Sequence, residues 1–151
     1  MKKKKQNLNA SIIDHSSEPW FEIVFNQQFQ FMAILSPEGR VLEINRLALA
    51  AQGAKREDYV GKLFWESPAW HGLPEWQEIW QQRLHQASCQ RTPIKTEDVY
   101  QIADGSTRYA EASTTGLYQS DNGPLIGYVV QATDITERRL VEKLVHENES
   151  R

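Results

Sequence analysis

Few side chains in this sequence could act as nucleophiles or bases. The chain has four histidines and one cysteine, Cys89. His71 and His85 fall in the predicted body, whereas His15 and His146 fall in predicted tails. No serine-hydrolase, phosphate-loop, zinc-peptidase or paired-cysteine motif is present. Because no nucleophile stands beside a base, we predict no catalytic residue, no metal ligand and no enzyme activity for this chain.

Carboxylates and the single cysteine suggest no chemistry either. Glu97, Asp98 and Asp104 lie on or beside a predicted strand, and their pattern indicates a solvated sheet edge. Cys89 has no cysteine to pair with inside the chain. An absence of disulfides is typical of a reducing compartment, so we predict a cytoplasmic location.

Aromatic side chains are the residues best suited to binding. Three of the five tryptophans fall between Trp70 and Trp80, and each can bury about 200 Å². Such a cluster forms either a filled core or a pocket wall for a small planar or apolar ligand, and periodicity alone does not decide which side chains face inward. The candidate pocket residues are Phe64, Trp65, Trp70, Trp80, Leu84, Tyr100, Tyr109 and Tyr128.

The stretch GYVVQATDIT, residues 127–136, changes from strand period to helix period within three residues. Asp134 could accept hydrogen bonds from the first N–H groups of the following helix, or pair with Arg138 or Arg139. Thr136 could cap that helix. The alternative is a simple helix start. We predict a signal-coupling joint made of Asp134, Ile135, Thr136 and Arg138.

Length and charge exclude several classes of protein. A chain of 151 residues fits one domain that can bury a core without disulfides or metals. The formal net charge of -3 gives no basic field for nucleic acid, and the one basic cluster, Lys2 to Lys5, is typical of a solvated tail. No apolar run approaches the roughly 18 residues of a membrane span.

Alternation and turn residues predict five strands and several helices. A Pro-Glu-Gly turn joins the first two strands, and Asp-Gly and Asn-Gly turns join the last three into an antiparallel meander. Asn45 can cap a helix that Gly53 ends, and Pro74 suits the first turn of a longer helix over 74–88. The predicted strands are 29–35, 40–44, 94–102, 107–118 and 125–133.

Two terminal helices carry apolar stripes. Trp20, Ile23 and Val24 recur at helical spacing after a cap at Ser17. Such a helix must pack on the body or on a second copy of it. After Thr136 the spacing recurs, in two partial heptads, at Leu140, Val141, Leu144 and Val145. We therefore predict a homodimer formed through the terminal helices.

These elements predict an α+β fold with one five-stranded antiparallel sheet, helices on one face, and additional N-terminal and C-terminal helices. Over residues 17–147 the sequence resembles the PAS domains. The resemblance rests on the Pro-Glu-Gly turn, INRLAL, EDYVGK, FWESPAWHGLPEWQ and the closing DITERR. FWESPAWHGLPEWQ is similar to one subgroup found in bacterial sensor kinases.

The resemblance implies that the last strand lies centrally beside the first. It divides the chain into a disordered tail (1–16), a sensor domain with its flanking helix (17–136) and the start of an exit helix (137–151). Some members bind haem through a histidine on the long helix, but His85 lies beside the apolar stripe of that helix. Flavin-adduct members carry a cysteine before the long helix, whereas Cys89 follows it. We therefore expect neither haem nor flavin.

Three functions fit these features. The first is a cytoplasmic sensory or dimerisation module that binds a small ligand and passes a signal through the C-terminal helix to an output domain, such as a histidine kinase. The second is a ligand-free structural dimer adaptor. The third is a small cone-fold enzyme, which would need a His–Asp pair in its cavity.

Overall fold

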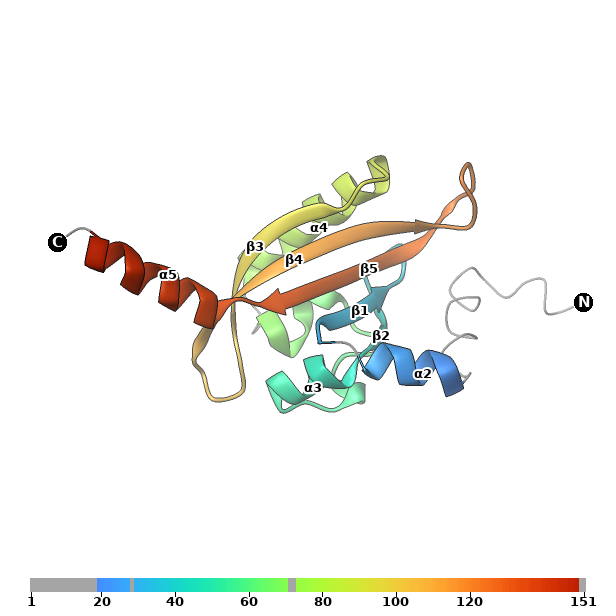
Figure 1. Ribbon diagram of the computed structural model, residues 1–151. Coiled ribbons are helices and arrows are strands. Elements are labelled where there is room, and N and C mark those ends of the chain that lie inside the picture. Colours follow the sequence, from blue (N-terminus) through green and yellow to red (C-terminus); the bar gives the residue numbers. More distant parts are fainter. Residues whose placement is uncertain (1–18, 28, 71–72, 150–151) are drawn as a thin grey trace, which may run out of the picture.

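The fold is built on one antiparallel sheet with the strand order β2-β1-β5-β4-β3. The computed structural model describes residues 19–27, 29–70 and 73–149, so Ser17, His71 and the predicted tail lie outside the described residues. The predicted α+β fold is confirmed, with the last strand between the first and the fourth (Figure 1). The strands are β1 (Phe31–Leu35), β2 (Val41–Ile44), β3 (Ile94–Gln101), β4 (Thr107–Tyr118) and β5 (Leu125–Asp134).

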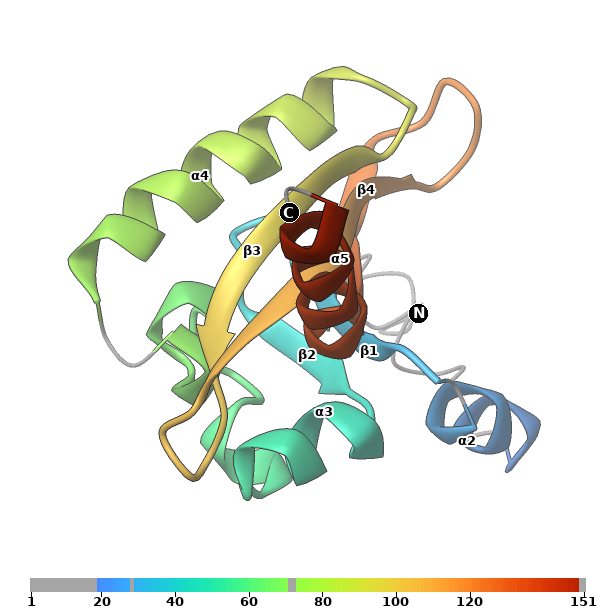
Figure 2. The same cartoon turned by 60° about the vertical axis from the view of Figure 1, so that its left-hand side comes forward.

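Helices surround the sheet unevenly. Figures 1 and 2 show α3 and α4 on one side of the sheet, while α5 extends away from the end of β5. Three short 3-10 turns lie between α3 and α4. The helices and turns are α2 (Pro19–Asn26), α3 (Arg46–Gln52), η2 (Arg56–Asp58), η3 (Phe64–Glu66), η4 (Pro68–Trp70), α4 (Pro74–Cys89) and α5 (Thr136–Glu149).

Local sequence signals set the helix ends. The Asn45 side chain accepts a hydrogen bond from the Ala48 N–H at the start of α3. Gly53 ends that helix in the left-handed region, with φ of 59°, where a glycine avoids the steric cost of a Cβ. Pro74 is the first residue of α4, where its missing N–H costs no hydrogen bond.

The N-terminal helix differs from the prediction in its surroundings. The Trp20, Ile23 and Val24 side chains of α2 are 56%, 60% and 52% exposed, whereas Phe25 is buried. Strand β1 begins at Phe31, two residues later than predicted. Phe29, which the prediction included in the strand, lies outside the sheet and is 96% exposed. The apolar stripe of α2 is therefore not covered by the described part of the body.

Asn45 ties three elements together although it is fully buried. Its Oδ1 accepts hydrogen bonds from the backbone N–H groups of Met32 (3.1 Å) and Ala48 (3.2 Å). Its Nδ2 donates to the backbone oxygens of Gln30 (2.9 Å) and Phe25 (3.3 Å). One amide thus satisfies backbone groups at the end of α2, along the entry to β1 and at the start of α3.

We expect Asn45→Ala to lower the free energy of unfolding by about 3 kcal/mol, because it leaves buried backbone groups without partners. Asn26→Ala is the matched control, since the Asn26 side chain bonds the Arg46 N–H at an exposed position and should cost about 1 kcal/mol or less. Urea denaturation measures both values. Equal losses in the two variants would contradict the role assigned to Asn45.

Candidate functional site

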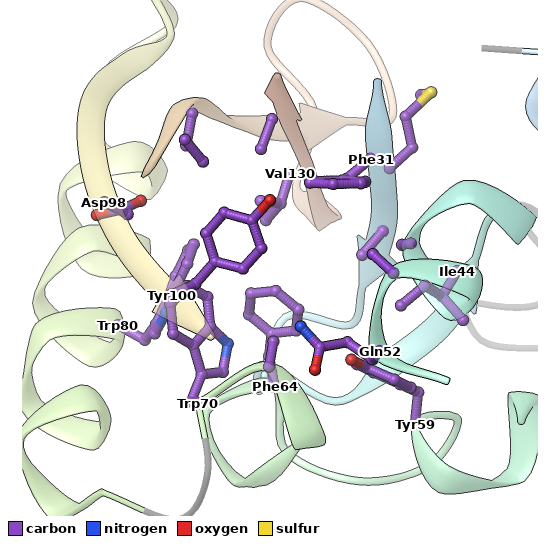
Figure 3. A pocket seen from close by; sticks show the side chains of 18 residues that line it. Phe31, Ile44, Gln52, Tyr59, Phe64, Trp70, Trp80, Asp98, Tyr100 and Val130 are labelled. Atoms are coloured by element: carbon purple, nitrogen blue, oxygen red, sulfur yellow. The ribbon is translucent and has the colours of Figure 1, made fainter. Parts of the chain in front are cut away.

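A cavity of about 80 Å³ lies between the inner face of the sheet and the helical segments α3, η3, η4 and α4. Figure 3 shows Trp70, Trp80 and Tyr100 on one side of it, and Phe31, Ile44 and Tyr59 on the other. The space exists because small residues occupy much of its wall, and its volume is several times the roughly 10–15 Å³ that one water molecule needs. These small residues are Ala33, Ala48, Ala51, Ala69, Ala110, Ala112 and Ala132.

Four of the eight predicted pocket residues line this cavity: Phe64, Trp70, Trp80 and Tyr100. The Phe64 ring meets Trp70 and Trp80 edge to face, with centroids 5.8 and 4.8 Å away. On the sheet side, Tyr100 meets the Phe31 ring edge to face at 5.9 Å. The aromatic cluster is therefore both core and cavity wall.

The other four predicted pocket residues lie elsewhere. Trp65 and Leu84 pack against the turn between β1 and β2, where a Cβ on Gly39 would lie 2.8 Å from the Trp65 ring and 3.3 Å from Leu84. Tyr128 is 3% exposed and lies under the end of α4, and Tyr109 lies half-buried at the start of α5. None of these four side chains is part of the cavity wall.

A buried ion pair stands at the cavity edge, and the expectation of a solvated sheet edge was wrong for Asp98. Its carboxylate accepts hydrogen bonds from both terminal nitrogens of Arg83 (3.0 and 2.9 Å) and from the Thr96 hydroxyl (3.2 Å). The Arg83 and Asp98 side chains are 9% and 6% exposed. A missed signal existed, because strand alternation places Asp98 on the same face as Tyr100.

Two tryptophans that line the cavity each carry an indole N–H without a partner within the described residues. Among the described residues, the buried side-chain polar atoms without a hydrogen bond are Trp70 Nε1, Trp80 Nε1 and the hydroxyl of Thr114. Trp70 and Trp80 are 7% and 1% exposed, and both line the cavity. An unsatisfied buried donor costs about 1–3 kcal/mol. In Figure 3 the Trp70 nitrogen faces the space between Tyr100 and Phe64.

The joint at the end of β5 is organised by Asp134. Its carboxylate accepts hydrogen bonds from the Tyr100 hydroxyl, from Arg108 Nε (2.9 Å) and from the Thr136 N–H (2.9 Å). Burial alone would raise the pKa of Asp134, but hydrogen bonds from Arg108, Tyr100 and Thr136 outweigh it and lower that pKa to about 2. Burial and the hydrogen bond to Asp134 raise the pKa of Tyr100. Asp134 is thus an anion and Tyr100 a donor at neutral pH.

The predicted acceptance of a helix N–H by Asp134 is confirmed, but the predicted ion-pair partner was wrong. Asp134 pairs with Arg108, a residue of β4. Arg138 instead lies 3.6 Å from Glu111 and 3.7 Å from Glu142. The sequence places Arg138 four residues from Asp134, yet the helix turns its side chain away, while strand pairing brings Arg108 across from β4.

Arg139, the alternative partner in the prediction, pairs with Glu97 at 2.8 Å. Thr136 does not cap α5 with its side chain, because it is already the first helical residue. Its hydroxyl accepts a hydrogen bond from the Tyr109 N–H at 2.8 Å, and the neighbouring Ile135 N–H donates to the Tyr109 oxygen at 2.8 Å. Ile135 and Thr136 therefore fasten the start of α5 to β4.

Strand register explains how a cavity residue reaches this joint. Ala110 of β4 pairs with Asp98 of β3 on one side and with Asp134 of β5 on the other. Tyr100 lies opposite Arg108, two pairs further along β3 and so on the same face as Asp98. Because Ala110 ends at its methyl group, the Tyr100 side chain can cross it diagonally to Asp134. One side chain thus touches both the cavity and the joint.

The remaining candidates lie apart from the cavity. His85 and Cys89 are exposed, and within the described ranges neither lines the cavity. In the same part of the chain, no group of three histidine, cysteine or acidic side chains is placed to hold a metal ion. None of the described helices combines the length and the apolar character needed to cross a membrane.

The sequence model of the PAS fold family matches residues 25–140. The chain therefore belongs to this family. The match covers the sheet, the cavity and the first residues of α5. The five-stranded sheet, the resemblance in sequence and this match therefore agree.

Individual relatives are more distant. A segment of 48 residues is 38% identical to the sensor histidine kinase TmoS of Ectopseudomonas mendocina, covering 32% of this chain and 5% of that kinase. The PAS domain of BvgS from Bordetella pertussis is 25% identical, with a TM-score of 0.65 over 87% of this chain and 96% of that domain. A PAS domain of an HTR-like protein from Haloarcula marismortui shares the fold at 20% identity, with a TM-score of 0.61 over 89% of this chain and all of that chain.

We expect Asp134→Asn to produce a pH-dependent loss of stability. The pKa of Asp134 is about 2 in the folded chain, below the roughly 3.9 of an unfolded aspartate, so its contribution is present above pH 4 and lost as the pH falls to 2. The native chain should exceed the variant by about 1–2 kcal/mol near pH 7, less than the full shift because the side chain is partly exposed.

Urea unfolding at a series of pH values measures this difference. The gap between the two proteins should close between pH 4 and pH 2. A gap that stays constant over that window would show that the charge of Asp134 does not contribute.

Proposed function

We propose that this chain is a cytoplasmic sensory module of a bacterial signal-transduction protein, such as a sensor histidine kinase. In this proposal, a small ligand enters the cavity and changes how α5 is held, and α5 transmits that change to an output domain. The kinase match supports the class of output domain, although it spans 5% of that relative. No haem or flavin is needed for this function.

The observation that carries the proposal is the position of Tyr100. Its ring lines the cavity, and its hydroxyl donates to Asp134, which in turn accepts from the first N–H of α5 at 2.9 Å. A ligand that moves the Tyr100 ring must therefore lengthen or reorient a hydrogen bond to a charged group. Hydrogen bonds to charged groups contribute about 1.5–3 kcal/mol each, enough to change the population of two helix arrangements.

The two arrangements differ in how firmly α5 is attached to the sheet. Thr136 and Ile135 hold the start of α5 to Tyr109 of β4, whereas from Glu137 onward the helix is exposed. A change in the hydrogen bonds of Asp134 therefore acts where α5 begins. Among the described residues, this is where hydrogen bonds to the Tyr109 backbone attach the helix to the sheet. The rest of the helix would follow as a lever.

We expect Tyr100→Phe to uncouple the cavity from α5. Filling the cavity with Ala112→Leu mimics occupancy, and hydrogen exchange of amides 136–145 reports on α5. With Tyr100 present, filling should change these exchange rates by about fivefold, corresponding to a coupling of about 1 kcal/mol. With Tyr100→Phe the same filling should change them by less than about twofold.

Tyr109→Phe is the matched control. Tyr109 belongs to β4 and contacts the start of α5, but it is not among the residues that line the cavity. It should leave the effect of cavity filling intact. If Ala112→Leu leaves α5 exchange unchanged in the native background, the proposed route through Tyr100 is wrong.

We further propose that α2 and α5 associate with a second copy of the chain. The support is the exposed apolar surface of both terminal helices. On α2 this surface is the stripe of Trp20, Ile23 and Val24. On α5, Leu140, Val141, Leu144 and Val145 are each at least half exposed, which is unfavourable for a helix surrounded by water. The ligand-free adaptor remains the second candidate, and the same surfaces support it.

We expect Leu144→Glu to shift the chain from a dimer to a monomer, because it places a charge in the apolar stripe of α5. Lys143→Glu, one position away on the polar side, is the control and should leave the native mass unchanged. Sedimentation equilibrium measures both. A native chain that is monomeric at high micromolar concentration would contradict the dimer and, with it, the adaptor.

A further inference from the structure

The unpaired donors at the cavity specify what a ligand must offer. Trp70 Nε1 and Trp80 Nε1 have no hydrogen-bond partner among the described residues, and both rings are more than nine-tenths buried. An N–H group in such a place is stabilised by any acceptor that reaches it. Of the three unpaired buried polar atoms in the described part of the chain, these two line the cavity.

The other polar groups of the wall are already engaged. The Tyr100 hydroxyl donates to Asp134, and burial raises the pKa of Tyr59, whose hydroxyl bonds the Ala69 backbone. The Gln52 amide donates to the Gln101 backbone oxygen at 2.7 Å. The two indole N–H groups are therefore the buried side-chain donors of the wall that are left without a partner within the described residues, so a ligand that satisfies them must supply an acceptor.

The charges at the cavity exclude a charged ligand. Asp98 is the only charged residue among the described residues of the wall, and Arg83 neutralises it through two hydrogen bonds of 2.9 and 3.0 Å. A ligand carboxylate or ammonium would enter an apolar space without a counter-charge, which is strongly unfavourable. The aromatic rings and alanines of the wall favour an apolar body instead.

We propose that the cavity binds a small, uncharged, largely apolar molecule that carries a hydrogen-bond acceptor, such as a carbonyl oxygen or a ring nitrogen, and that Trp70 donates to this acceptor with Trp80 as the second available donor. The inference rests on the proposed sensory function and names the class of ligand for the same cavity. Trp70 then determines specificity, because its donor distinguishes a ligand with an acceptor from an apolar molecule of the same shape.

Two probes of equal shape test this proposal: acetophenone, and α-methylstyrene, in which a CH₂ group replaces the carbonyl oxygen. Binding of each to the 151-residue chain is followed by two-dimensional NMR of the tryptophan indole N–H groups. Acetophenone should move the Trp70 or Trp80 indole proton downfield and slow its exchange with solvent. α-Methylstyrene should leave the exchange of both protons unchanged.

Tryptophan variants separate the hydrogen bond from packing. Trp70→Phe keeps an aromatic ring but removes the donor, so acetophenone should bind about fivefold to tenfold more weakly, whereas α-methylstyrene should change by less than about twofold. Trp80→Phe tests the second donor in the same way. Trp20→Phe, on the exposed face of α2, is the matched control and should change neither affinity.

The inference is overturned if both variants treat the two probes alike, or if acetophenone shifts neither indole proton. In that case the cavity-filling response of α5 through Tyr100 decides the sensory function separately. Binding of neither probe to the native chain also overturns the proposed ligand class. An α5 that responds to acetophenone but not after Tyr100→Phe would support both the ligand class and the signalling route.

Discussion

The carboxylate of Asp134 is the group on which the connection between the sheet and the exit helix depends. It receives donors from β3, from β4 and from the first residue of α5. An ionised carboxylate in this position needs those donors, because without them the surrounding protein would penalise its charge. The low pKa of Asp134 expresses the same balance. Through Tyr100, this balance includes a wall of the cavity.

The sheet places two acid–base pairs symmetrically about Ala110. Asp98 and Asp134 are both register partners of that alanine, and each has its own arginine. The pair with Arg83 is buried and joins α4 to β3, whereas the pair with Arg108 is partly exposed and faces α5. The first is suited to fix the cavity, since breaking a buried pair costs about 3–5 kcal/mol. The second is suited to respond, since water reaches it.

Local signals made much of the fold predictable from the sequence. The cap at Asn45 and the glycine at Gly53 act within a few residues, so they could be read without knowing the tertiary structure. The burial of Asp98 could not be predicted so directly, because its partner Arg83 belongs to another element. The two side chains meet only when α4 packs on β3. Even so, Arg83 follows Trp80 by three residues on the same face of α4, and strand alternation turns Asp98 inward. Two polar residues on facing apolar surfaces were the signal for a buried pair.

The cavity was predictable only in part, because aromatic residues mark a core as readily as a binding site. Trp65 and Trp70 are five residues apart and equally bulky, yet the turn at Gly39 takes one ring and the cavity takes the other. What distinguishes them is the set of alanines contributed by α3, β4 and β5. Small side chains leave the space, and their positions become meaningful only after the strands are paired.

The central place of β5 also has a consequence for how this protein is made. The strand that fills the middle of the sheet is the last of the five to leave the ribosome. Until it arrives, the hairpin of β1 and β2 and the hairpin of β3 and β4 each keep an open edge, and neither can complete the cavity. Joining them requires contacts between residues about 100 positions apart, such as Phe31 with Ala132, which are slow to form. The nascent chain therefore holds two adhesive half-sheets that a chaperone, or rapid insertion of β5, must keep from pairing with other molecules.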